Sequence, residues 1–192
     1  MAEEGVSPIL SALYSRRDEE ARALAAAAGT LTIFEAAALG RDATVDGILT
    51  REPESVNAFA PDGFFPLALA AFFAPASTVR LLLDRGAQVA AVARNPMRVQ
   101  GLHAAVAARN RDATALLLDR GADPNARQQV GYTALMGAAG SGREDLVALL
   151  LEHGADPTLV SEDGKTAAAL AREHGHAALA GRLEALAAGG RD

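Results

Sequence analysis

Apolar residues recur along the chain in blocks with a period near 33 residues. The clearest block is a Leu triplet, found at residues 81–83, 116–118 and 149–151. The third residue after each triplet is the Gly of a Gly-Ala pair, at Gly86, Gly121 and Gly154. Self-similarity at a fixed period of this size is the signature of a repeat architecture, in which each unit buries its apolar face against the next.

The other half of each unit is rich in small residues. Aligned Ala residues fall at Ala36, Ala70, Ala105, Ala138 and Ala171. Small side chains favour a first helix that approaches its neighbours closely. The Leu triplets, with Val79 and Val147 before them, form the buried stripe of a second helix. Gly after each second helix suits a left-handed C-terminal residue. Each unit is therefore predicted to be a helix pair.

The register and motifs resemble the ankyrin repeat family. The signature T-P-L-H-x-A is matched in part by Pro66 and Leu67, by residues 102–105, and by residues 133–135. The resemblance extends over roughly residues 5–187 and implies a β-turn and two antiparallel helices in each repeat. It predicts an all-α fold, an ankyrin-repeat solenoid of stacked antiparallel helix pairs with short hairpin loops. It also implies that His103, at the signature His position, hydrogen-bonds neighbouring loops.

A single ankyrin-repeat domain is predicted over residues 1–192. Its expected parts are an N-terminal capping helix pair at 5–30, repeats at 31–61, 62–95, 96–128 and 129–161, a C-terminal capping repeat at 162–187 and a loose tail at 188–192. Ser7 and Pro8 predict the first helix start, as N-cap and N1 residues. Pro53 interrupts the first repeat, and Arg182 replaces the start of a Leu triplet in the last. Residues 93–98 predict an insertion that lengthens one hairpin finger.

Composition narrows the possible partners and locations. The 192 residues are 50% hydrophobic and 22% charged, which is enough for one folded domain with a sizeable core. The net charge of −6, without a Lys/Arg stripe, argues against nucleic acid. The absence of Cys excludes disulfides and thiolate metal sites. An acidic start without a leader, and no apolar stretch long enough for a bilayer, predict a cytoplasmic protein without a membrane partner. The Ala-, Gly- and Arg-rich composition favours a bacterial source.

Three short motifs resemble chemical sites, but their sequence context favours a structural role for each. Gly164, Lys165 and Thr166 resemble the end of a phosphate-binding loop, but Leu159 stands where that motif needs Gly. His174 and His176 lack a third metal ligand at helical spacing. Ser141 has no preceding strand for a nucleophile elbow. No catalytic residue, cofactor or metal is predicted, so the chain is not expected to be an enzyme.

The resemblance implies binding of another protein through the concave face, formed by hairpin tips and the exposed ends of first helices. The predicted partner-binding residues are Tyr14, Leu39, Phe64, Phe72, Phe73, Met97, Val99, Tyr132, Ser141 and Lys165. The predicted function is a monomeric scaffold for protein–protein interaction. The alternative is an inhibitor or neutralising partner of a specific enzyme or toxin.

The second repeat carries most of the aromatic residues. Four of the six Phe residues lie at 64, 65, 72 and 73. In the repeat register, Phe64, Phe72 and Phe73 occupy variable and partly exposed positions, which would leave an apolar patch of a few hundred Å². Phe72 and Phe73 are therefore hypothesised to belong to a binding hot spot. The alternative is that the rings fill space against the irregular first repeat and the long third finger.

Overall fold

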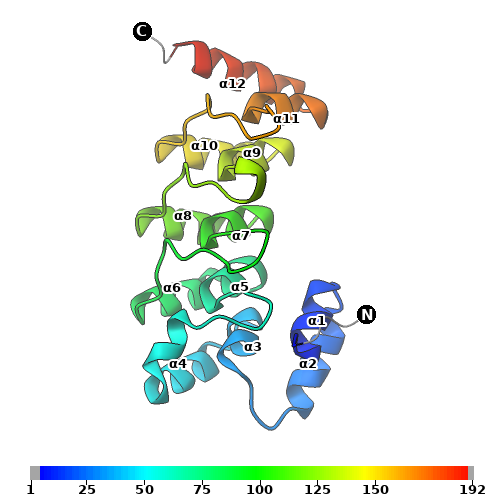
Figure 1. The fold of residues 1–192 in the computed structure, drawn as a ribbon, viewed down its shortest axis with the longest axis vertical. Coiled ribbons are helices and arrows are strands. Elements are labelled where there is room, and N and C mark those ends of the chain that lie inside the picture. Colours follow the sequence, from blue (N-terminus) through cyan, green and yellow to red (C-terminus); the bar gives the residue numbers. More distant parts are fainter. Residues whose placement is uncertain (1–4, 190–192) are drawn as a thin grey trace.

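The computed structural model describes residues 5–189, and every regular element in that range is helical. Five helix pairs stack into an elongated column, with first helices in one row and second helices in another (Figure 1). The first helices are α3 (Ile33–Ala38), α5 (Pro66–Phe73), α7 (Gly101–Ala107), α9 (Ala134–Gly140) and α11 (Ala167–Glu173). The second helices are α4 (Asp42–Arg51), α6 (Ala76–Asp84), α8 (Arg111–Asp119), α10 (Glu144–Glu152) and α12 (Ala177–Gly189). The all-α prediction is confirmed.

Small side chains set the spacing of the first helices. The aligned Ala residues are all fully buried, at 0% exposure: Ala36, Ala70, Ala105, Ala138 and Ala171. Each first helix contacts the next one along the row, from α3 to α11. A methyl group at these positions lets the backbones approach, and a larger side chain would strain a close-packed interior.

The second helices contribute the large core residues. The middle Leu of each triplet is fully buried, at 0% exposure: Leu82, Leu117 and Leu150. Val79 and Val147 lie beside them at 0% and 1% exposure. Burying one such side chain stabilises the fold by about 1.5–3 kcal/mol. The apolar stripe predicted from the triplets therefore joins consecutive repeats into one core.

Local signals begin and end these helices as the sequence predicts. The Thr133 and Thr166 side chains accept hydrogen bonds from backbone N–H groups in the first turns of α9 and α11. Gly86, Gly121 and Gly154 follow the second helices with φ of 90°, 86° and 85°, in the left-handed region. The first repeat departs from this pattern, because the 3-10 helix η1 (Pro53–Asn57) replaces its Gly turn.

Four hairpin loops, called fingers below, connect the repeats at residues 58–65, 91–100, 126–133 and 159–166. Backbone hydrogen bonds close them from Ala60 N to Phe64 O, Ala93 N to Val99 O, Gln128 N to Tyr132 O, and Ser161 N to Lys165 O, at 2.8–2.9 Å. The second of these bonds spans two more residues than the others. It confirms that the insertion at 93–98 lengthens one finger.

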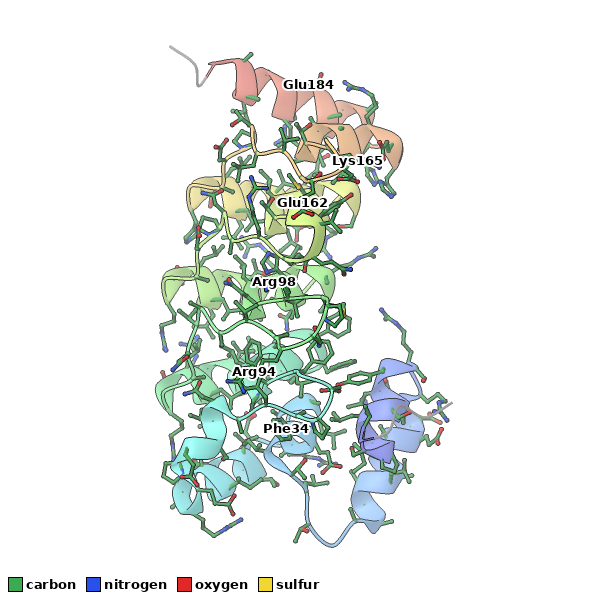
Figure 2. All side chains as sticks on the ribbon, in the orientation of Figure 1. Phe34, Arg94, Arg98, Glu162, Lys165 and Glu184 are labelled. Atoms are coloured by element: carbon green, nitrogen blue, oxygen red, sulfur yellow. The ribbon has the colours of Figure 1, made fainter. Side chains whose placement is uncertain are left out.

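The fingers are also joined to one another. The backbone N–H of each finger donates to a carbonyl of the preceding one: Arg94 to Gly63 at 2.8 Å, Gln129 to Met97 at 3.0 Å, and Glu162 to Val130 at 2.9 Å. Figure 2 shows Arg94 and Arg98 of the finger at 91–100 and Glu162 of the finger at 159–166 along one side of the column. The finger tips therefore form a continuous surface that is ordered by backbone contacts.

The N-terminal helix pair, α1 (Pro8–Tyr14) and α2 (Asp18–Ala27), forms where the sequence predicts it. Ser7 caps α1 by accepting a hydrogen bond from the backbone of Leu10 at 3.2 Å. The pair was expected to cap the stack, but it lies beside α3 and α5 instead of continuing the column (Figure 1). The step from Ala12 to Ala36 is shorter than a repeat and omits a finger. The backbone hydrogen bonds between successive fingers, which align the other helix pairs, therefore do not extend to this pair.

The C-terminal end also differs slightly from expectation. Helix α12 continues through Gly189, so residues 188 and 189 are helical, although a loose tail was expected from 188. The rest of that expected tail lies outside the described residues. Arg182, at the start of the missing Leu triplet, is exposed and forms an ion pair with Glu144 at 2.5 Å. In the last helix pair, a charged side chain therefore stands where the other repeats have Leu, and it contacts the preceding repeat.

Candidate functional site

The finger face is the surface formed by the four fingers and the C-terminal ends of the first helices. The N-terminal helix pair covers its lower part. Ile9, Leu10 and Leu13 of α1 are buried at 4%, 3% and 6% exposure. They share a core cluster with Ala38 of α3 and Leu69 of α5. Because these helices belong to repeats one and two, that part of the finger face is occupied by the chain's own N-terminus.

Tyr14 lies at the centre of this contact. Its ring centroid is 6.1 Å from that of Phe64 and 5.8 Å from that of Phe73. Its hydroxyl donates a hydrogen bond to Asp62 Oδ2 at 2.7 Å. Phe72 packs edge-on against Phe73, with centroids 4.6 Å apart. Phe64 and Phe73 therefore pack within the fold, as the alternative prediction had it. Their packing partner is Tyr14 of the N-terminal helix pair.

The ten predicted partner-binding residues fall into three groups by exposure. Tyr14 and Met97 are exposed, at 36% and 50%. The half-buried ones are Leu39, Phe64, Phe72, Phe73, Tyr132, Ser141 and Lys165. Val99 is a core residue at 8% exposure, although a surface position was expected for it. The inserted residues 93–98 form the finger tip, and Val99 closes its base, where it packs with the core.

Two hollows together include six of these residues, three in each. The arginine hollow, with a volume of about 530 Å³, includes Leu39, Phe72 and Phe73 and the ends of α1, α3, α5 and α7. The finger hollow, about 670 Å³, includes Tyr14, Phe64 and Met97. Tyr132, Ser141 and Lys165 line neither hollow and lie further along the column. Phe64 and Phe73 each contact Tyr14, so the hollows share a wall.

Exposed apolar side chains concentrate on the fingers. Within residues 5–189, five large hydrophobic residues are exposed: Tyr14, Met97, Val130, Val160 and Leu186. Met97, Val130 and Val160 lie on three consecutive fingers, at 50%, 42% and 45% exposure. Val130 and Val160 were not predicted. Val130 stands in the same register as Met97, each eight residues before its aligned Ala. That register could have identified it.

Backbone strain gathers on the same side. The described non-Gly residues with positive φ are Arg16 at 55°, Arg98 at 50°, Arg109 at 59° and Val130 at 60°. The position of Arg98 is Gly in the other fingers, at Gly63, Gly131 and Gly164, and the position of Arg109 is Gly40, Gly142 and Gly175 in other repeats. A left-handed conformation costs an L-residue about 1–2 kcal/mol. Such outliers cluster at functional sites, because the side chain is kept for another reason.

Hydrogen bonds hold the remaining polar residues of the finger face. The Tyr132 hydroxyl donates to Asp163 at 3.2 Å. Desolvation, followed by the bond to this carboxylate, raises the pKa of Tyr132. Lys165 forms an ion pair with Glu173 at 2.7 Å, and this hydrogen bond raises the pKa of the Lys165 ammonium. Lys165 therefore already has an acidic partner, although an exposed pair of this kind stabilises by only about 0–1 kcal/mol.

His103 connects two loops from within the core. It is 4% exposed, and its Nδ1 accepts a hydrogen bond from the Gln100 N–H at 3.3 Å. Its Nε2 lies 3.0 Å from the Ala126 carbonyl, to which it donates in the neutral tautomer. Burial lowers the pKa of His103, against the opposing effects of the Ala126 carbonyl and Asp123. The side chain therefore acts as a neutral structural bridge between loops.

The other histidines are also engaged in local contacts. His174 Nδ1 lies 2.9 Å from the Leu170 carbonyl, and the His176 ring lies over Gly142. Within residues 5–189, no group of three His, Cys, Asp or Glu side chains is close enough to hold a metal ion. Over the same range, no helix combines the length and apolar character needed to cross a bilayer.

Comparison with known proteins adds one family match. The family model for ankyrin repeats, in three copies, matches residues 102–183. This segment begins in α7 and ends in α12, so it spans most of the last three helix pairs. No curated protein matches the chain. Ankyrin repeats generally mediate protein–protein interaction and are typically non-enzymatic modules.

Proposed function

Because this chain belongs to the ankyrin repeat family, we propose that it is a scaffold that binds a partner protein through its finger face. A rigid solenoid with variable loop residues suits recognition of a folded surface. The function resides in these surface residues, since a fold by itself does not specify activity.

The observation that carries the proposal is the row of exposed apolar residues on consecutive fingers. Met97, Val130 and Val160 are the exposed large hydrophobic residues of the fingers, and the fingers that bear them are joined by backbone hydrogen bonds. Apolar side chains held outward on an ordered backbone are costly to leave in water and mark interaction sites. Their order also reduces the entropy that a partner must remove on binding.

The N-terminal helix pair covers the lower part of the finger face, and this limits where a partner docks. The N-terminal helix pair packs on α3 and α5, so the open finger face begins at the third repeat. Of the sequence-predicted residues, Met97, Tyr132, Ser141 and Lys165 lie on this open part, together with Val130 and Val160. We place the centre of the proposed interface here. Met97 precedes the segment that matches the ankyrin repeat family, and the other five residues lie within it.

Affinity capture from the native cell, followed by mass spectrometry, tests the proposal. The bait is the full chain, and the test variant combines Met97→Ser, Val130→Ser and Val160→Ser. Leu186→Ser is the matched control, because Leu186 is equally exposed, at 51%, but lies on α12 away from the fingers. We expect one partner to bind the wild type and the control, and to bind the triple variant at least about tenfold more weakly.

A partner that binds the triple variant as tightly as the wild type would contradict the proposed surface. The unfolding midpoint of each bait checks that the fold is intact, and little change is expected since the substituted side chains are solvent-exposed. If the captured partner is an enzyme, its activity with and without the scaffold distinguishes recruitment from inhibition.

A further inference from the structure

The arginine hollow lies between the N-terminal helix pair and the ends of three first helices. Leu13 and Arg16 of the α1 end form one wall, and Ala107 and Arg109 of the α7 end form the opposite one. Its volume of about 530 Å³ falls in the range that holds several side chains of a bound segment. The hollow exists because the N-terminal pair lies beside the stack instead of beneath it.

The charge of this hollow is opposite to that of the whole protein. Its lining includes three arginines, Arg16, Arg22 and Arg109, and one carboxylate, Asp18. The chain as a whole has a net charge of −6. In the part of the chain that the structure describes, the three guanidinium groups are exposed and none forms an ion pair with a carboxylate.

Two of these arginines occupy strained backbone positions. Arg16 and Arg109 have φ of 55° and 59° in the turns between first and second helices. The equivalent residue in three other turns is Gly, at Gly40, Gly142 and Gly175, where the same conformation costs little. Both strained arginines line the same hollow, so backbone strain and positive charge coincide at this place.

The floor of the hollow is apolar. Leu39, Phe72 and Phe73 contribute half-buried side chains from the ends of α3 and α5. The Phe72 ring contacts Phe73 edge-on. Aromatic anchors surrounded by arginines are the residue types that contribute most to binding energy at protein interfaces.

We propose that the arginine hollow binds a short segment of the partner protein in which carboxylates flank an apolar side chain. This inference rests on the proposed function and names the chemistry of the partner. A guanidinium group presents parallel N–H donors that match a carboxylate in two-point contacts. The apolar side chain of the segment packs on Phe72 and Leu39, which removes the remaining apolar surface from water.

Selection of a displayed library of random 12-residue peptides on the full chain tests this inference. Enriched peptides are then synthesised with a fluorescent label and titrated against wild type and variants. We expect enrichment of Asp and Glu beside Leu, Phe or Ile. The double variant Arg16→Gly and Arg109→Gly should bind these peptides at least tenfold more weakly, because each lost charged hydrogen bond contributes substantially.

Arg98→Gly is the matched control. Arg98 also has a positive φ, of 50°, and is also exposed, but it lies on a finger outside the hollow. Its place on the finger loop is visible in Figure 2. The control therefore loses one positive charge and gains backbone freedom at one position, as each single substitution of the double variant does, and its peptide affinity should change less than threefold. Gly suits all three positions, so the unfolding midpoint of every variant should stay equal or rise.

Three results would overturn the inference. They are enrichment of neutral or basic peptides, equal binding by the double variant, and no enrichment on the wild type. A labelled single-stranded oligonucleotide that binds the wild type and not the double variant would assign the arginines to nucleic acid instead. The proposed function is judged separately, by loss of the captured partner in the finger variant of Met97, Val130 and Val160. Failure of the peptide inference and failure of the proposed function are therefore distinguishable.

Discussion

The Tyr14 hydroxyl donates a hydrogen bond to the Asp62 carboxylate at 2.7 Å, and this bond joins the end of α1 to the tip of the first finger. The same tyrosine ring lies against Phe64 and Phe73 of the second repeat. These contacts add to the apolar packing of Ile9, Leu10 and Leu13 on α3 and α5, which also holds the N-terminal helix pair against the finger face. A partner that reaches repeats one and two must bind this pair or displace it.

Substitution of Tyr14 should loosen the N-terminal pair without unfolding the repeats. Tyr14→Ala removes both ring contacts, each worth about 0.5–1.5 kcal/mol beyond burial, together with the hydrogen bond. Tyr14→Phe removes only the hydroxyl, about 0.5–1.5 kcal/mol at most for a bond at the surface. Hydrogen exchange should accelerate in residues 8–27 in the order Tyr14→Ala, then Tyr14→Phe, while α9 and α11 keep their wild-type protection. Faster exchange spread evenly over the chain would show that the pair is part of one cooperative core.

Phe72 and Phe73 should respond differently to substitution, although the sequence treats them as equivalent. Phe73→Ser removes a ring that packs on Tyr14, so it should expose α1 and α2 to limited proteolysis. Phe72→Ser removes the half-buried ring that lines the arginine hollow, so it should leave digestion unchanged and weaken peptide binding. Cleavage sites mapped by mass spectrometry distinguish the two. Equal protease sensitivity in both variants would contradict the separate roles.

Replacing an arginine in a left-handed turn with Gly should stabilise the fold. Arg109→Gly relieves a backbone cost of about 1–2 kcal/mol and incurs about 0.5–1 kcal/mol of extra chain entropy. Its free energy of unfolding in urea should therefore rise by up to about 1.5 kcal/mol. Arg80→Gly, in the exposed interior of α6, is the control and should lose about 1 kcal/mol. Destabilisation by both would mean that the Arg109 side chain makes a stabilising contact that outweighs the strain.

Gly142 should tolerate no side chain. Its φ is +66°, and an added Cβ would lie 2.3 Å from His176 Cε1. Gly142→Ala combines a left-handed backbone cost of about 1–2 kcal/mol with displacement of the His176 ring. Gly154→Ala is the control, because its φ is +85° and an added Cβ meets nothing within 4 Å. Thermal unfolding should show a larger loss for Gly142→Ala, and equal losses would assign the whole cost to the backbone.

His103 should make stability depend on pH below neutrality. Burial lowers its pKa in the folded state below the unfolded value of 6.5. As the pH falls through 6.5, the unfolded chain therefore binds a proton that the folded chain does not. The free energy of unfolding should decrease, by at most about 1.4 kcal/mol per pH unit, until the pH passes the folded pKa.

The variant His103→Gln isolates this effect. Its unfolding free energy should be lower than wild type at pH 7.5, because two loop hydrogen bonds are changed, and the difference should shrink toward pH 5.5. The comparison is needed because the pKa of His153 is raised, mainly by its bond to the Leu149 carbonyl. That group loses its contribution as the pH rises, which is the opposite trend. A constant difference between wild type and variant across the range would contradict the assignment to His103.

Features set by contacts within one repeat period could be predicted from sequence. The helix starts at Ser7 and Thr133 depend on side chains within the same turn. The buried Ala and Leu rows follow from a period that places equivalent residues against each other, and the two extra residues of the long finger follow from the spacing between Ala70 and Ala105. Every one of these depends on residues close in the chain or exactly one repeat apart.

The binding surface was predicted less completely, because exposure depends on how neighbouring segments pack. Val99 lies on the same finger as Met97, yet the inserted residues 93–98 place one in the core and the other at 50% exposure. The left-handed conformation of Arg109 could have been inferred from Gly at the equivalent positions. Val130 also has a positive φ, next to that of Gly131, and the repeat pattern does not indicate this backbone conformation.

The sequence by itself determined the stacked helix pairs, their caps and the long finger, since each repeat makes the same short-range contacts as its neighbours. Only the tertiary structure decided that α1 and α2 lie against the first helices of repeats one and two. That docking includes the hydrogen bond from Tyr14 to Asp62, which is 48 residues away in the chain and outside the repeat period. The period carries no information about a contact of this kind, because it arises from side-chain fit between a repeat and a segment that is not one.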